Sequence, residues 1–191
     1  MTTYKIDRAK DHNELARKAS QTIASYIDLA LKKRDRTQIV FSGGSTPSAT
    51  YCLLGKEHLP WDRVDLFLGD ERWVDANNSA SNAAMIHRTL LSSVPGSACQ
   101  FHSVPTVEYS SPKESADALT NLLKKICLGE PPVFDLVLLG LGDDGHTASL
   151  FPGSDTLKIS DSWVGVGSAK GHHRITLTAP VLSNARKVIF L

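Results

Sequence analysis

The sequence has few cysteines, almost no excess charge and no long apolar run. Its three cysteines, Cys52, Cys99 and Cys127, are odd in number and widely spaced, which disfavours a disulfide framework or a zinc site. The 21 Lys and Arg residues balance 20 Asp and Glu, so no net field favours nucleic acid or an anionic membrane as a partner. No stretch approaches the roughly 18 apolar residues of a membrane helix. Met1–Lys10 lacks the apolar core of a signal peptide, so we expect a cytoplasmic location.

Length and composition are typical of a folded globular chain. Of the 191 residues, 41% are hydrophobic and 21% are charged, which is too apolar for a disordered protein. A chain of this length suits one domain, because domains have about 100–200 residues. We therefore expect residues 1–191 to form a single domain, acting on a small molecule as a monomer or a small homo-oligomer.

Helical and strand patterns alternate along the chain. Apolar residues recur at helical spacing after Asp11, where Glu14 completes a capping box, and short apolar runs end at glycines further on. The expected helices start at Asp11, Pro47, Ser81 and Ser111, and the expected strands are Gln38–Phe41, Val64–Leu68, Gln100–Val104, Asp135–Leu139, Trp163–Val166, Arg174–Thr178 and Lys187–Leu191. This alternation predicts an α/β fold whose mostly parallel sheet is covered by helices on both faces.

Three polar, glycine-rich segments follow expected strands. They are Ser42–Pro47, Gly69–Arg72 and Gly140–Thr147. Ligands of open parallel sheets bind outside the carboxyl ends of the strands. We therefore expect these three segments, although far apart in sequence, to meet at one rim and form a binding site.

The first segment has the features of an anion-binding turn. Gly43 and Gly44 allow the backbone to approach a ligand closely, and hydroxyl groups come from Ser42, Ser45 and Thr46. The helix that follows supplies free N–H groups and the positive end of its dipole. The alternative is an ordinary strand-to-helix turn capped by Thr46, but two adjacent glycines among three hydroxyls favour a phosphate or carboxylate.

The other two segments carry candidate catalytic groups. Arg72 is suited to bind a phosphate or an oxyanion through two N–H groups, and Asp70 to orient a sugar hydroxyl or a histidine. A solvated run of charges is the alternative for this segment. His146 lies in a glycine-rich loop two residues from Asp144. A histidine held by a carboxylate is a candidate general base, although a lone histidine more often has a structural role.

The third segment also matches the G-x-G-x-x-G pattern of dinucleotide-binding loops, at Gly140, Gly142 and Gly145. Two adjacent aspartates lie where a pyrophosphate needs N–H donors, and Pro152 interrupts the chain before a full helix could form. A nicotinamide dehydrogenase is therefore a minor alternative. No H-E-x-x-H or similar spacing occurs, so we predict no metal site.

These segments resemble those of the 6-phosphogluconolactonase family. The matching motifs, in the order of the family, are Ser42–Pro47, Gly69–Val74 followed by Ser81 and Asn82, Leu139–Gly153 and Arg174–Thr178. The resemblance implies a Rossmann-like, doubly wound α/β fold shared with glucosamine-6-phosphate deaminases, and no cofactor. It also implies hydrolysis of 6-phospho-D-glucono-1,5-lactone to 6-phospho-D-gluconate in the pentose phosphate pathway.

The resemblance further implies a role for each site residue. His146 would be the general base that activates water, with Asp144 beside it, and Asp70 and Arg72 would line the sugar. The phosphate-binding residues would be Ser42, Gly43, Gly44, Ser45, Thr46 and Arg174. Because a lactone is already an activated ester, a positioned water, a base and a cation at the oxyanion suffice for the step.

Two other functions of the same site remain open. The first is that of a glucosamine-6-phosphate deaminase, which the resemblance disfavours because Phe151 replaces its catalytic carboxylate and Arg72 replaces its Tyr. The second is a non-catalytic sugar-phosphate-binding domain. The family's chain continues past the strand matching Val188–Leu191, so we expect this sequence to lack the last helix and strand, together with a phosphate-binding lysine.

Overall fold

The computed structural model describes residues 4–191. Its helices are α1 (His12–Leu31), α2 (Ser45–Leu54), α3 (Asn82–Thr89), α4 (Pro112–Ile126) and α5 (Ala179–Ser183), with short 3₁₀ turns η1 (Trp61–Arg63), η2 (Gly96–Ala98) and η3 (Asp155–Lys158). Its strands are β1 (Thr37–Phe41), β2 (Val64–Leu68), β3 (Asp70–Arg72), β4 (Gln100–His102), β5 (Leu136–Leu139), β6 (Val164–Ala169), β7 (His172–Leu177) and β8 (Val188–Phe190). The alternation of helices and strands that the sequence predicts is confirmed.

Five of the strands form a parallel sheet in the order β4-β2-β1-β5-β8. β1 lies at its centre and pairs with β2 from Thr37↔Val64 onward and with β5 at Ile39↔Leu136. β2 and β5 are buried along their whole length, which explains why β5 is a continuous apolar run and why Asp65 is the single polar residue of β2. The predicted α/β fold with a mostly parallel sheet is therefore confirmed.

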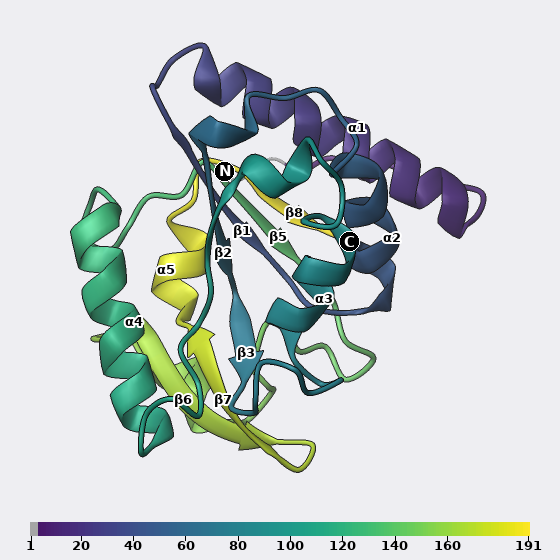
Figure 1. Ribbon diagram of the computed structural model, residues 1–191. Helices are drawn as coiled ribbons and strands as arrows, with labels where there is room; N and C mark the ends of the chain where they lie inside the picture. Colours follow the sequence, from purple (N-terminus) through teal and green to yellow (C-terminus); the bar gives the residue numbers. More distant parts are fainter. Residues whose placement is uncertain (1–3) are drawn as a thin grey trace.

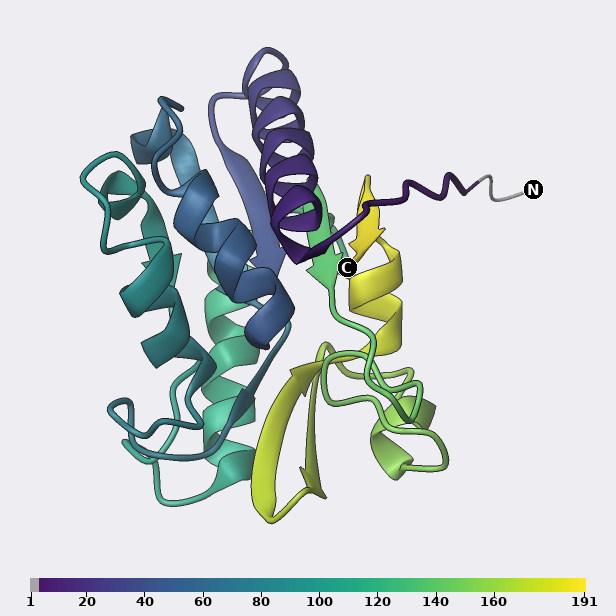
Figure 2. The same cartoon turned by 90° about the vertical axis from the view of Figure 1, so that its right-hand side faces the viewer.

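Helices cover both faces of this sheet. α1, α2 and α3 pack side by side along one face, whereas α4 and α5 lie on the other (Figure 1). Turned by 90°, the molecule shows α1, α2 and α3 together in front of the strands (Figure 2). The chain runs from β1 through α2 to β2 in one direction and from β5 through α5 to β8 in the other. This reversal places the two groups of helices on opposite faces, since each crossover is right-handed.

A second, three-stranded antiparallel sheet in the order β3-β7-β6 lies below the first. The charged segment after β2 was expected to be a loop, and this expectation is wrong because Asp70–Arg72 forms β3; the existence of a separate antiparallel sheet was not predicted. β6 and β7 are joined by a hairpin loop of Lys170 and Gly171, whose positive φ values of 51° and 81° suit the twist of such a turn. The tight turn forces β6 and β7 to be antiparallel.

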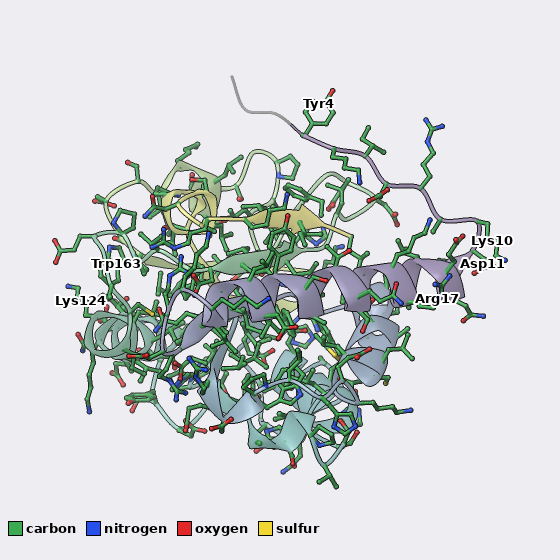
Figure 3. The ribbon with its side chains drawn as sticks, turned by 90° about the horizontal axis from the view of Figure 1, so that it is seen from above. Tyr4, Lys10, Asp11, Arg17, Lys124 and Trp163 are labelled. Carbon is green, nitrogen blue, oxygen red and sulfur yellow. The ribbon has the colours of Figure 1, made fainter. Side chains whose placement is uncertain are left out.

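Local contacts at the helix ends follow the sequence closely. The Asp11 side chain accepts the N–H of Glu14 at 2.8 Å, and the Glu14 carboxylate accepts the N–H of Lys10 at 2.7 Å (Figure 3). On the far side of the molecule, Lys124 of α4 lies 5.6 Å from the ring centre of Trp163, which ties this helix to the start of β6. Within residues 4–191, no helix combines the length and the apolar character needed to cross a membrane.

Candidate functional site

The site lies where the direction of winding reverses, between β1 and β5. The loops after these two strands leave the sheet at its carboxyl edge, side by side, which is the usual ligand position in such sheets. They border a cavity of about 310 Å³. The sequence-predicted residues that line it are Ser42, Gly43, Gly44, Ser45, Thr46, Asp70, Arg72, His146 and Arg174. Asp144 is hydrogen-bonded to His146 but does not itself line the cavity. The three distant segments thus meet at one rim, as the sequence predicts.

The turn after β1 is built to present backbone N–H groups. Gly44, at φ 118°, is the N-cap of α2, and the helix begins at Ser45, so Thr46 lies within the first turn and is not the expected cap. The Tyr51 hydroxyl donates to the carbonyl of Ser42 at 2.9 Å and fixes the turn from below. The Ser42 hydroxyl oxygen is buried and has no hydrogen-bond partner among residues 4–191. A polar ligand would satisfy this hydroxyl.

Two arginines lie next to each other on neighbouring strands of the second sheet. β3 and β7 pair Arg72 directly with Arg174, and both side chains line the cavity. Burial lowers the pKa of Arg174, and repulsion from Arg72 lowers it further. The Arg174 guanidinium lies 3.6 Å from the Asp70 carboxylate, which offsets one charge. The Nε of Arg72 is buried without a partner in the part of the chain that the structure describes. The electrostatics therefore favour an anionic ligand.

The third segment places an imidazole at the cavity. Nδ1 of His146 is hydrogen-bonded to the carboxylate of Asp144, and this bond lowers the pKa of Asp144. The ring stacks on Phe151 with centroids 4.3 Å apart. Gly142 permits this position, because a Cβ there would lie 2.2 Å from the ring. With Nδ1 engaged, Nε2 is the nitrogen that remains for a ligand or a water.

The loop after β5 is not a dinucleotide-binding turn. In such folds a long helix starts at the last glycine of the pattern. Here Thr147 and Leu150 form a bridge after Gly145, and the next helical segment is the four-residue η3. Within residues 4–191, no group of three His, Cys, Asp or Glu side chains is arranged to hold a metal ion.

Two polar lining residues, Asn82 and Lys170, were not among the site residues that the sequence predicted. Asn82, the first residue of α3, donates from its side chain to the carbonyl of Asp70 at 2.9 Å. Lys170 extends from the tip of the β6–β7 hairpin to the rim of the cavity and lowers the pKa of Asp144, although less than His146 does. Gly171, between two expected strands, is a turn signal that would have placed Lys170 in the connecting loop. Asn82 belongs to a motif that carries the family resemblance, but no local pattern assigned it a role, because its position depends on the packing of α3 against β3.

Fold and site together define a class of protein: an open α/β fold with an anion-binding turn, two arginines and a carboxylate-held histidine around one cavity. Comparisons with known proteins give the family. Residues 10–191 match the model of the glucosamine-6-phosphate isomerases/6-phosphogluconolactonase family, to which this chain belongs. The family resemblance that the sequence analysis found is confirmed.

Individual relatives agree with this family. A 6-phosphogluconolactonase of Nostoc sp. is 39% identical over 97% of this chain and 78% of its own length. The crystal structure of a 6-phosphogluconolactonase from Shewanella baltica superposes with a TM-score of 0.87 at 30% identity, over 95% of this chain and 78% of that one. A monomeric glucosamine-6-phosphate deaminase has a TM-score of 0.79 over 98% of this chain and 81% of its own, but at 16% identity it shows the common fold alone.

Proposed function

We propose that this protein hydrolyses 6-phospho-D-glucono-1,5-lactone to 6-phospho-D-gluconate, with His146 as the general base. One observation carries the proposal: an imidazole held by Asp144 and a turn suited to a phosphate border the same cavity. The 6-phosphogluconolactonases of Nostoc sp. and Shewanella baltica, both at least 30% identical over most of the chain, support this substrate.

In this mechanism the phosphate binds to the turn Ser42–Thr46. The backbone N–H groups and hydroxyls of the turn and the N-terminus of α2 are its ligands. Arg174, which lines the same cavity, adds positive charge. Asp70 and Arg72 line the same cavity as this turn and the imidazole, and we place the sugar ring and its carbonyl against them. Binding of the phosphate end thereby fixes the carbonyl relative to the base, which is the main use of a remote anion in such a reaction.

His146 then acts through Nε2. The bond from Nδ1 to Asp144 fixes the tautomer in which Nε2 accepts a proton. Nε2 takes a proton from water as its oxygen attacks the lactone carbonyl, and Arg72 stabilises the oxyanion that forms. The intermediate collapses with cleavage of the bond to the ring oxygen, which receives the proton from the imidazolium. The new carboxylic acid loses its proton to solvent, so each turnover releases one proton.

This released proton provides the test. Turnover of 6-phosphogluconolactone is measured by titration with base at constant pH, after subtraction of the spontaneous hydrolysis. We expect His146→Asn to lower kcat by about 10²–10⁴-fold, the contribution of a general base, with little change in KM. His58→Asn, at an exposed position outside the cavity, is the matched control and should keep the parent rate. An equal rate for the parent and the His146 variant would refute the assigned base.

Two further assays test the alternatives. A deaminase would release ammonia from glucosamine 6-phosphate, which we do not expect because the apolar ring of Phe151 stacks against His146. A non-catalytic sugar-phosphate-binding domain would bind 6-phosphogluconate in calorimetry without turning over the lactone.

A further inference from the structure

A buried carboxylate next to the site has no role in the reaction proposed above. Glu71 is the middle residue of β3 and only 1% exposed. Because side chains alternate along a strand, Asp70 and Arg72 face the cavity and Glu71 faces the other side of the sheet. Burial raises the pKa of Glu71, although hydrogen bonds from three backbone N–H groups oppose that rise.

The Glu71 carboxylate binds the start of α3. One oxygen accepts the N–H groups of Asn82 and Arg72, each at 2.8 Å. The other accepts the N–H of Ala83 at 2.7 Å and the hydroxyl of Ser81 at 3.2 Å. All four partners are donors, so the position requires a group that only accepts. A carboxylate meets this requirement, whereas the N–H₂ end of a glutamine would face N–H donors.

The helix start held in this way carries a side chain back to the site. The Nδ2 of Asn82 donates to the carbonyl of Asp70 at 2.9 Å and lies 3.4 Å from the Asp70 carboxylate. The same amide packs against Gly43 of the anion-binding turn, in the space that a Cβ at that position would occupy. Asn82 is only 2% exposed, so its amide has little freedom to move. It therefore contacts two of the three segments that form the cavity.

We propose that Glu71 is a positioning residue of this site, which acts through Asn82 to hold Asp70 and the Gly43 turn at their working separation. Glu71 touches neither substrate nor base. A cap that served only the helix would need no side chain leading from α3 into the cavity, whereas Asn82 provides one. The proposal deepens the lactonase function proposed above and rests on it.

The test is a double-mutant cycle on kcat/KM, measured well below the melting temperature. We expect Glu71→Gln to lower kcat/KM by about 10- to 100-fold, because small misplacements of a site cost that much. Asn82→Ala should cause a similar loss. The decisive variant combines both: if Glu71 acts through Asn82, the double variant is no worse than Asn82→Ala alone. Losses that multiply in the double variant would overturn the proposal, as would parent-like kinetics of Glu71→Gln.

A matched control separates positioning from stability. Ser111→Ala removes the N-cap of α4, whose hydroxyl accepts the N–H of Glu114 at 3.2 Å on the other face of the sheet. This variant should lose stability but keep the parent kcat/KM, and an equal kinetic loss in it would overturn the proposal. If Glu71→Gln does not fold, Glu71→Asp enters the same cycle and is judged by the same criteria, because its carboxylate is one methylene shorter and is drawn away from the start of α3.

The cycle also has a readout that does not depend on turnover. The affinity for 6-phosphogluconate, measured by calorimetry in the parent and the three variants, should show the same non-additive pattern. A parent that binds this ligand with that pattern but does not turn over the lactone would refute the lactonase function and leave the positioning role standing. An additive pattern in a protein with full activity would do the reverse.

Discussion

Gly43 provides the strictest steric test of the site. An ideal Cβ at this position would lie 2.0 Å from Oδ1 and 2.5 Å from Cγ of Asn82. Non-bonded heavy atoms prefer about 3.5–4.0 Å, so Gly43→Ala must displace the amide by about 1.5 Å. The amide is buried and bonded to Asp70, and moving it breaks that bond.

The expected cost follows from these contacts. Overpacking a buried position costs about 1–3 kcal/mol and loss of the hydrogen bond about 0.5–1.5 kcal/mol, so Gly43→Ala should lower the free energy of unfolding by about 2–4 kcal/mol. For a chain of this size each kcal/mol corresponds to about 2–4 °C, so the melting temperature should fall by about 5–15 °C. Displacing the turn and Asp70 should also reduce kcat/KM by about 10²-fold.

Two variants make this prediction specific. Gly69→Ala, at the end of the neighbouring strand, would place its Cβ 3.6 Å from Val40 and 3.8 Å from the carbonyl of Phe41, which are ordinary contacts. It should change stability by less than about 1 kcal/mol. Asn82→Ala added to Gly43→Ala removes the clash and should restore part of the melting temperature without restoring activity. A Gly43→Ala protein with parent-like melting and kinetics would refute the steric reasoning, and so would an equal loss in Gly69→Ala.

Two further predictions concern hydrogen-bonded carboxylates. Asp144→Asn should lower kcat by at least about tenfold with little change in KM, because His146 loses the charged partner of Nδ1; a parent-like kcat in the titration assay would contradict this. Burial raises the pKa of Asp65, but hydrogen bonds from Arg36 and His102 outweigh it, and the net pKa is lowered. The resulting stabilisation is present above the unfolded pKa of about 3.9 and is lost as the pH falls through the lower folded value. Asp65→Asn should therefore cost about 1.5–3 kcal/mol in urea unfolding at about pH 7, with a gap that narrows below about pH 4; a gap independent of pH would contradict this.

Much of the fold was predictable because its signals are local. The capping box at Asp11, the largely apolar β2 and the apolar run of β5 each depend on structure within a few residues, and the helix and strands form where these patterns predict them. The rim of the site was predictable for a different reason. In a parallel sheet all carboxyl ends point the same way, so the loops after Phe41 and Leu139 must meet once the strands are assigned.

The second sheet was not predictable in the same way. Asp70-Glu71-Arg72 is a charged triplet without apolar alternation, so nothing in it indicates a strand. It becomes one because the backbone of β2 continues past Gly69 into pairing with β7, a strand far later in the chain. The role of Asn82 was not predicted for the same reason: it depends on where Glu71 holds the start of α3, and no local sequence pattern indicates this tertiary contact.

The two arginines that line the cavity are brought together by the pairing of β3 with β7, which the sequence did not predict. Register Arg72↔Arg174 puts two guanidinium groups on one face of the sheet, directly opposite each other, which by itself destabilises the pair of strands. Among residues 4–191, Asp70 is the one carboxylate within ion-pair distance of Arg174, at 3.6 Å. A fold selected for stability alone would alternate the charges, so the uncompensated cation is better explained by a ligand that carries the missing negative charge. The phosphate and the developing oxyanion of the proposed substrate are two such charges, one toward the Gly43 turn and one toward His146.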